Sequence, residues 1–414
     1  MYVSPLYTIQ WKEWGLTSGQ LTLLGVASQA GIGLGQYPCY LLYKWTSTNF
    51  KLQKADRIQG VFTSGCVIAS TAGVGLVLIY GNASNFPLLV VLMLVYGMGT
   101  GATFTHAINV ANFNLVKAPG MKRQAIGLMS FSFGWGGLTY ALMYYYVVSL
   151  FGFSVNFFLL AFVTLLALLP RYLYIVRSKE AIPEVELSEI HGSSQIVPTE
   201  ERSAFRVVPL TIHDYLLNSI VWLSSITSAF GIGIGASFLA GIGNMSASVT
   251  DYEPEYLTFQ LTMVFLGVQT GARLATAVVY ASYNNPFILA FWQVLQVMGI
   301  GCFLFKSNIV TLYASTVLVA CGFGGIWAAF PVMVAVSWPG IPQVDYMRSI
   351  SLAYFFCGSG TIIVVFIQNA LLQIGSWSEL NPNMYLSAFI YYFISAAFCT
   401  ALSVYLGLRV SRLY

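Results

Sequence analysis

The chain alternates between long apolar blocks and short polar stretches. Eleven of the blocks are each about as long as the ~20 residues that an α-helix needs to cross the hydrocarbon core of a bilayer. Backbone polar groups in lipid must be hydrogen-bonded within the protein, so each block is predicted to be helical. The predicted helices span roughly residues 17–43, 59–80, 87–114, 124–150, 154–176, 215–242, 257–281, 286–305, 309–336, 347–373 and 384–408. This pattern predicts an all-α, multi-pass membrane protein.

The composition agrees with a chain that is surrounded by lipid. Hydrophobic residues make up 57% of the sequence and charged residues only 8%, too few charges to cover a water-exposed surface at this length. The net charge of +4 therefore gives no reason to expect nucleic acid as a partner. The expected surroundings are membrane lipid.

Lysine and arginine are concentrated on one predicted side of the membrane. By the positive-inside rule this side is the cytosol, which receives the C-terminus and the loops at 44–58, 115–123, 178–214 and 337–346, while the N-terminus lies outside. Lys12 and Lys306 fall on the opposite side, and Arg273 lies within a helix. The other 15 of the 18 basic residues are Lys44, Lys51, Lys54, Arg57, Lys117, Lys122, Arg123, Arg171, Arg177, Lys179, Arg202, Arg206, Arg348, Arg409 and Arg412.

Glycosylation sequons and cysteines add little chemistry. Sequons that begin at Asn82 and Asn244 both fall in loops expected outside, which fits the orientation. The cysteines are scattered through apolar helices without the spacing of a metal site, so we interpret them as small core residues and expect no cofactor. The first 15 residues lack the basic start and apolar run of a cleavable signal peptide.

A weak internal repeat relates the two parts of the chain. Leu24-Gly25-Val26 matches Leu266-Gly267-Val268 at an offset of 242 residues (24 to 266), and the same offset maps residues 1–9 onto 243–251, directly after the helix predicted at 215–242. The N-terminal part therefore lacks a counterpart of that helix. We interpret the chain as a 6+6 transporter whose first helix has been lost, most simply through a misplaced start codon. Its domains are then 1–177, a cytosolic linker at 178–214, and 215–414.

The linker and the glycines have distinct expected roles. Residues 178–214 mix glutamates with arginines and prolines, which predicts a partly disordered connection between the halves. Glycines recur within the apolar blocks and allow close approach of helices in lipid. They include Gly31, Gly33, Gly35, Gly127, Gly134, Gly136, Gly231, Gly233, Gly235, Gly322, Gly324, Gly325, Gly358 and Gly360.

Arg273 is the formal charge that falls well inside a predicted helix. A charged side chain at the bilayer centre costs at least ~2.5–3.5 kcal/mol, so such an arginine normally faces the protein interior or a water-filled cavity. Gln269 lies one turn before it and Thr276 about one turn after, on the same face. The guanidinium group matches a carboxylate, which makes an organic anion the natural ligand. The alternative is an arginine that caps carbonyls or gates near the cytosolic end.

His106 is the histidine that lies within a predicted helix. Helical spacing gathers Thr105, Asn109 and Asn112 into a narrow arc with His106 beside Asn109. A histidine takes up and releases a proton near physiological pH, which suits proton coupling. The alternative is a histidine that is hydrogen-bonded between helices.

The remaining polar groups predict transport rather than catalysis. The pairs Gln29 with Gln36 and Gln293 with Gln296 either line a cavity or hydrogen-bond between helices. Every Asp and Glu, including Asp56, falls in a loop or at a helix end, which argues against a strongly ion-driven pump. We find no phosphate loop, catalytic triad or metal motif, so we do not expect an enzyme.

Three motifs carry a resemblance to a known family. They are Gln20-Leu21-x-x-Leu24-Gly25 running to Gly31-x-Gly33-x-Gly35; Asn112-Phe113 followed by Gly127 and Gly134-Trp135-Gly136; and Gly271-x-Arg273. The chain thereby resembles the nodulin-like branch of the major facilitator superfamily, near the fungal monocarboxylate-transporter-homologue group. The resemblance implies a twelve-helix fold, of which eleven helices (5+6) remain here, and solute transport with Arg273 as an anion contact. The expected location is the plasma or vacuolar membrane.

The chain departs from that family at two places. The pattern of the superfamily's first cytosolic gate is reduced to Gly35-x-x-x-Cys39-x-x-x-Tyr43-Lys44, and Gln269 stands where monocarboxylate transporters have an acidic residue. The expected function is alternating-access transport of a small organic anion such as a monocarboxylate. The rival is a non-transporting membrane protein, either a receptor-like scaffold or an inactive truncated transporter.

Overall fold

Nearly every described residue is helical in the computed structural model of the chain, and none of them forms a strand. The structure describes residues 16, 18–50, 52–80, 85–114, 119–151, 155–166, 218–249, 254–282, 287–305, 308–336, 343–375 and 384–411. Eight of the described helices are long and apolar enough to cross a membrane. The chain is therefore an α-helical, multi-pass membrane protein.

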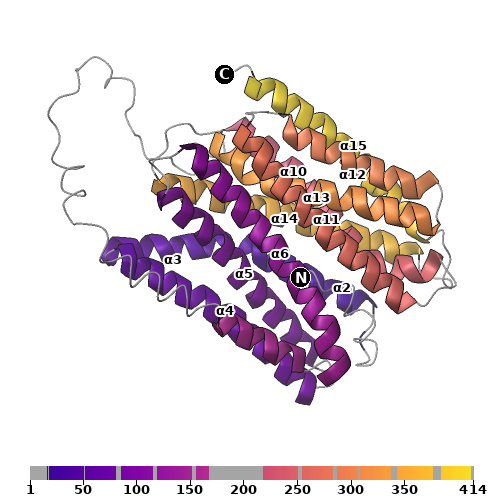
Figure 1. Ribbon diagram of the computed structural model, residues 1–414, viewed down its shortest axis with the longest axis horizontal. Helices are drawn as coiled ribbons and strands as arrows, with labels where there is room; N and C mark the ends of the chain where they lie inside the picture. The colour runs from indigo at the N-terminus through magenta and orange to yellow at the C-terminus, as the bar shows by residue number, and fades with distance from the viewer. Residues whose placement is uncertain are drawn as a thin grey trace.

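The helices fall into two groups along the chain. The first half, residues 16–166, contains α2 (Ser18–Leu34), α3 (Gln36–Asn49), α4 (Leu52–Tyr80), α5 (Phe86–Asn114), α6 (Pro119–Phe151) and a short apolar helix, Val155–Leu166. The second half, residues 218–411, contains α10 (Ser219–Val249), α11 (Pro254–Ser282), α12 (Ile288–Phe305), α13 (Ile309–Val336), α14 (Gln343–Gly375) and α15 (Met384–Ser411). Figure 1 shows the two groups lying side by side as bundles of long helices.

Most predicted helices begin and end within a few residues of the observed ones, but the first prediction was wrong in detail. The stretch predicted as one helix at 17–43 is interrupted at Gly35 and extends to Asn49. Pro38 explains the interruption because its ring nitrogen cannot donate the helical hydrogen bond to the carbonyl of Leu34. The backbone of Gly35 stays in the right-handed helical region, with φ of −71°, so the chain continues in nearly the same direction.

Two polar connections are also shorter than the sequence predicted. The loop expected at 44–58 is helical at 44–49 and again from Leu52, so that Asp56 belongs to the first turns of α4. The sequon at Asn244 lies within α10, which runs to Val249, and not in a loop; Ser246 of that sequon is fully buried. The length of an apolar run therefore underestimates a helix that continues into polar residues. The linker predicted at 178–214 and the sequon at Asn82 lie outside the described residues.

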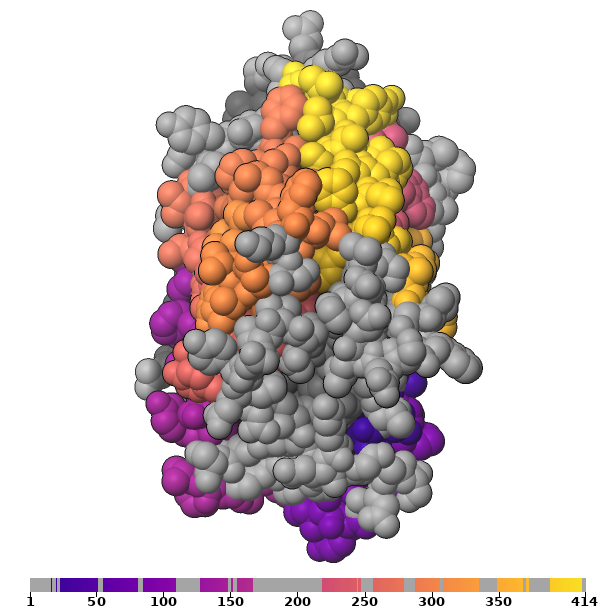
Figure 2. Space-filling model, turned by 90° about the vertical axis from the view of Figure 1, so that its right-hand side faces the viewer, coloured from indigo at the N-terminus to yellow at the C-terminus, as the bar shows by residue number. Residues whose placement is uncertain are grey.

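The two halves meet chiefly through two helix pairs, α2 with α14 and α6 with α11. Both pairs depend on small residues: a Cβ atom on Gly127 of α6 would lie 2.0 Å from the Cβ atom of Ala277 on α11. Such close approach lets helix backbones touch in lipid, where no hydrophobic force drives helices together. Figure 2 shows a face of the molecule on which the first half, indigo to magenta, and the second half, orange to yellow, occupy opposite ends.

Candidate functional site

Arg273 lies at the contact between the halves. It is fully buried on α11, and one of its terminal nitrogens, Nη1, donates a hydrogen bond of 3.1 Å to the backbone carbonyl of Ser130 on α6. A glycine on α6 makes room for it, because a Cβ atom on Gly134 would lie 2.8 Å from Oγ1 of Thr270 and 3.3 Å from Cδ of Arg273. The small residues of α6 thus bring a permanent positive charge to the boundary between the halves.

Aromatic rings from both halves surround the guanidinium group. Its central carbon lies 5.4 Å from the ring centre of Phe133 on α6 and 5.8 Å from that of Trp327 on α13. Cation–π attraction of this kind is strongest where water is excluded. Trp327 in turn stacks on Tyr354 of α14 with ring centres 5.8 Å apart, and meets Phe104 of α5 edge-on at 6.3 Å.

Two neighbouring polar groups make no hydrogen bond with any described residue. Neither amide atom of Gln269, one turn before Arg273 on the same face of α11, has such a partner, and neither has the indole N–H of Trp327. Gln269 is fully buried and Trp327 is 4% exposed. Buried polar groups are normally hydrogen-bonded, so this pair marks a place where donors and an acceptor remain for another molecule.

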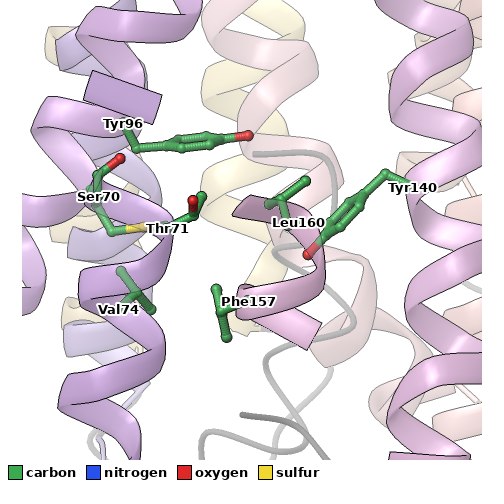
Figure 3. Close-up of a pocket in the computed structure, with 8 residues that line it drawn as sticks. Ser70, Thr71, Val74, Tyr96, Tyr140, Phe157 and Leu160 are labelled. Carbon is green, nitrogen blue, oxygen red and sulfur yellow. The ribbon is translucent and has the colours of Figure 1, made fainter. Parts of the chain in front are cut away.

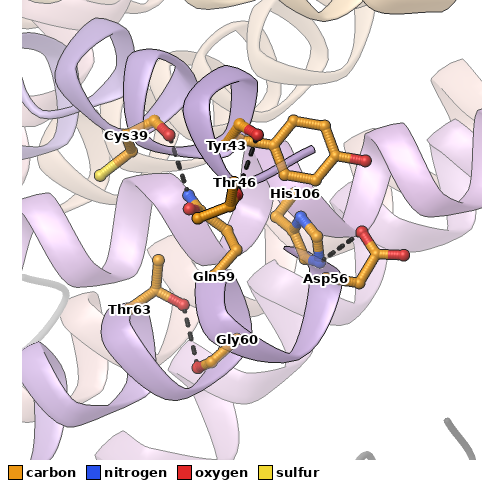
Figure 4. A network of polar contacts seen from close by, with 8 residues as sticks. All are labelled: Cys39, Tyr43, Thr46, Asp56, Gln59, Gly60, Thr63 and His106. Carbon is orange, nitrogen blue, oxygen red and sulfur yellow. Dashed lines mark hydrogen bonds and ion pairs between the residues drawn. The ribbon is translucent and has the colours of Figure 1, made fainter. Parts of the chain in front are cut away.

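A second polar cluster joins α3, α4 and α5 (Figure 4). Nε2 of His106 lies 3.8 Å from Oδ1 of Asp56, and the ring of Tyr43 meets the imidazole edge-on with centres 5.8 Å apart. His106 is 1% exposed, whereas the side chain of Asp56 is 23% exposed. Gln59 on α4 donates a hydrogen bond of 3.2 Å to the backbone carbonyl of Cys39 and fixes α3 against α4.

The other predicted site residues in the first half are dispersed. Asn109 and Asn112 lie on α5, but their side chains fall outside the described residues. Gln29 is buried on α2. Gln36 accepts a hydrogen bond from Thr105, which joins α3 to α5. The structure therefore does not bring the first-half candidates together with Arg273 in one described cluster.

Glutamines in the second half connect helices. Gln293 on α12 donates to the carbonyl of Thr227 on α10 at 2.9 Å and accepts from the hydroxyl of Ser403 on α15 at 2.7 Å. Gln296, one turn later, donates to the carbonyl of Gly231 at 2.9 Å. Of the two alternatives considered for this pair, the structure shows hydrogen bonding between helices. All six cysteines lie free within helices, three of them buried, which agrees with a core role.

A recess opens among α4, α5, α6 and the helix Val155–Leu166 (Figure 3), with a volume of about 340 Å³ that includes space open to the surroundings. Tyr96 and Tyr140 face it from different helices. The Tyr140 hydroxyl accepts a hydrogen bond of 2.7 Å from Asn156. None of the predicted site residues lines the recess. Its walls are Ser70, Thr71, Val74, Met93, Tyr96, Tyr140, Phe157 and Leu160.

Sequence reasoning missed the role of Asp56 and of the aromatic rings around Arg273. Asp56 was assigned to a loop, and its partner His106 is 50 residues away (56 to 106), so no local pattern connects them. The excess of aromatic residues, 15% of the chain, was a signal but did not say which of them meet.

Comparison with known proteins does not identify a relative. No protein-family model matches the chain, and no curated protein matches its sequence. The molecule itself offers two functional features: a buried arginine among aromatic rings between the halves, and a buried histidine beside a carboxylate.

Proposed function

We propose that the chain is a membrane transporter that moves a small organic anion, such as a monocarboxylate, by alternating access. The observation that carries the proposal is the position of Arg273, fully buried at the contact between two helical halves and held by groups from both of them. Holding a charge inside the membrane costs free energy, and charged residues found there are for that reason usually functional. Binding an anion between two halves that rock against each other is such a purpose.

The packing of the helices supports two related halves. In the first half α2 and α4 pack on α5, and in the second half α11 and α12 pack on α13. The contacts between the halves have the same symmetry, because α2 meets α14 and α6 meets α11. If α2 is matched to α11 and the later helices are matched in chain order, the contact of α2 with α14 corresponds to the contact of α11 with α6. This matching agrees with the 242-residue offset (24 to 266). The arrangement supports a major-facilitator-type bundle with eleven membrane helices here.

The groups around Arg273 suit a carboxylate. The guanidinium group of Arg273, which donates to the Ser130 carbonyl, presents its N–H donors in a planar fork whose geometry matches a carboxylate. The indole N–H of Trp327 and the amide of Gln269 supply further hydrogen-bonding groups. The surrounding rings exclude water and so strengthen attraction between an anion and the cation. Because Arg273 has no exposed surface in this conformation, the halves must move apart before an anion can enter.

We extend the proposal to orientation and membrane. The basic loops and the C-terminus face the cytosol under the positive-inside rule, and the expected membrane is the plasma or vacuolar membrane. A small-molecule solute and membrane lipid are then the partners.

The competing function is a non-transporting scaffold. The hydrogen bond from Arg273 to Ser130 crosses from one half to the other, and this observation favours an arginine that ties α11 to α6. In that case the aromatic rings stabilise the contact between α11 and α6 and bind no ligand. The two functions make opposite predictions for substitutions of Arg273.

The test is uptake of a radiolabelled monocarboxylate into liposomes that contain the purified protein. Transport predicts that Arg273→Gln abolishes uptake per protein molecule while folded yield changes little. It also predicts that Arg273→Lys, which keeps the charge but loses the two-pronged donor geometry, loses most of the affinity. Arg409→Gln is the matched control, because this exposed arginine also lies 6.0 Å from a ring centre, that of Tyr405, and donates to a hydroxyl, that of Ser219. A scaffold predicts lower yield for both Arg273 variants and no saturable uptake by any form.

A further inference from the structure

The cluster of His106, Asp56 and Tyr43 lies outside the contact around Arg273 and has its own chemistry. Three helices contribute one titratable side chain each: α3 gives Tyr43, α4 gives Asp56 and α5 gives His106. The Tyr43 hydroxyl and the Asp56 carboxylate are close enough to hydrogen-bond. The imidazole is buried, while the carboxylate retains contact with the surroundings.

We propose that His106 and Asp56 form a proton-binding site. A proton from solvent adds to Nε2 of the neutral imidazole, and the resulting imidazolium forms an ion pair with the Asp56 carboxylate. The pair changes from a net charge of −1 to a net charge of zero, and no other bond forms or breaks. Release of the same proton to water reverses the step.

The distance between the two groups suits such a change of state. At 3.8 Å, Nε2 and Oδ1 are too far apart for an ordinary neutral N–H···O hydrogen bond but close enough for an ion pair. Attraction between opposite charges is stronger inside a protein than in water. Proton binding therefore favours closer approach of α4 and α5 at this point, and proton loss removes the positive charge of the imidazolium from beside the carboxylate.

The partial exposure of Asp56 gives the proton a route. A proton can reach the partly exposed carboxylate from solvent and pass to the buried imidazole, which faces that carboxylate in Figure 4. Asp56 and Tyr43 lie directly against the imidazole. The helices packed around α5 carry further charged groups. Among those whose side chains the structure describes, Lys44 on α3 is exposed, while Arg57 on α4 and Arg348 on α14 are partly buried. The same helices also carry Lys54 on α4, Lys122 and Arg123 on α6, and Asp345 on α14. The charges on these groups also influence the pH at which His106 binds a proton.

The site is connected to the contact between the halves. The helix that carries Tyr43, α3, also packs on α14 of the second half, where the rings of Tyr37 and Phe355 lie 6.5 Å apart edge-on. A change in the charge of the His106–Asp56 pair thus acts on a helix that touches both halves. Under the proposed transport function, protonation of this pair alters the rate of uptake. That last step rests on the proposed function, whereas proton binding itself does not.

Proton binding is tested by the nuclear magnetic resonance of imidazole carbons in histidine-labelled protein in detergent micelles. The chain has three histidines, His106, His191 and His213, so the His106→Gln variant assigns the His106 signal by its loss. We expect that signal to titrate reversibly between about pH 5 and pH 8. In Asp56→Asn we expect the midpoint to move to lower pH by about one pH unit or more, because the counter-charge is lost. A His106 signal that does not titrate, or a midpoint unchanged in Asp56→Asn, overturns the proposal.

A matched control separates charge from packing. Gln59→Met removes a buried polar contact from the same stretch of α4 but removes no titratable group. We expect its His106 titration to match that of the unmodified protein. An equal shift in Gln59→Met and in Asp56→Asn would mean that loosened packing, and not the carboxylate, sets the titration, which also overturns the proposal.

The link to transport is tested separately by uptake into liposomes at about pH 5.5 and about pH 7.5. We expect the unmodified protein and Gln59→Met to show the same dependence on pH, and Asp56→Asn and His106→Gln to lose most of it. Uptake that depends equally on pH in all four proteins removes the link, even if the resonance of His106 titrates as expected. Absence of uptake in every protein instead counts against the transport function and leaves the resonance measurement to decide proton binding.

Discussion

Gly33 on α2 and Gly358 on α14 touch backbone to backbone across the boundary between the halves. A Cβ atom on Gly33 would lie 2.3 Å from Cα of Gly358, and a Cβ atom on Gly358 would lie 2.2 Å from Cα of Gly33. No flexible side chain is available to move aside at this contact. The distance between α2 and α14 is therefore set by the absence of side chains at these two positions.

The first prediction concerns this contact. Gly358→Ala should destabilise the protein by about 1–3 kcal/mol, because the added methyl group forces the two helices apart. Gly65→Ala is the control, since a Cβ atom there would meet nothing within 4 Å. That variant should be neutral, or more stable by up to about 1 kcal/mol, because alanine is the better helix former. Thermal unfolding of the purified variants in detergent measures both effects, and equal stability of the two variants contradicts the packing argument.

The second prediction contrasts two buried glutamines. Gln293→Leu breaks one hydrogen bond to α10 and one to α15, which should cost about 0.6–2 kcal/mol and lower the unfolding temperature. Gln269→Leu removes an amide that has no hydrogen-bond partner in the described part of the chain, so its stability should stay the same or rise.

The same pair of variants also reports on function. Under the proposed transport function Gln269→Leu should reduce uptake per molecule, because the amide lies one turn from Arg273, while Gln293→Leu should reduce yield only. Uptake unaffected by Gln269→Leu would exclude this amide from anion binding. A large loss of stability in Gln269→Leu would show that the amide is hydrogen-bonded in the membrane.

The third prediction concerns orientation. Single cysteines introduced at Ser194 and Ser248, in a background from which the six natural cysteines have been removed, should react with a membrane-impermeant maleimide from opposite sides. The expectation follows from the bias of basic residues, which places Ser194 in the cytosol and Ser248 outside. Labelling intact cells and then opened cells makes the measurement. Reaction of both cysteines from the same side would contradict the assignment.

Much of the fold could be predicted from the sequence because lipid leaves few choices to an apolar segment. The predicted bounds of 309–336 coincide with those of α13, which is apolar throughout. The ends of amphipathic or polar helices were harder: α3 carries lysine, serine, threonine and asparagine in its last six residues, and these read as a loop. Pro38 is a sequence signal for the break at Gly35. It could be interpreted as a break only with the knowledge that a helix continues on both sides.

The candidate sites were less predictable because they depend on contacts between distant helices. The free-energy cost of a charge in lipid was enough to infer from the sequence that other groups must stabilise the Arg273 guanidinium. The sequence could not show that Phe133 and Trp327 contribute to this stabilisation, because these residues lie on two other helices. The pairing of His106 with Asp56 was hidden for the same reason.

Under the proposed transport function, Arg273 would make the transport cycle sensitive to voltage. A charge inside a membrane feels the potential across it, and moving one elementary charge through the full potential changes the energy by about 2.3 kcal/mol per 100 mV. A bound carboxylate cancels the guanidinium charge, so a loaded carrier moves no net charge at this position, whereas an empty carrier moves one. In the proposed cycle the membrane potential therefore acts at this residue on the return of the empty carrier and leaves the loaded step untouched.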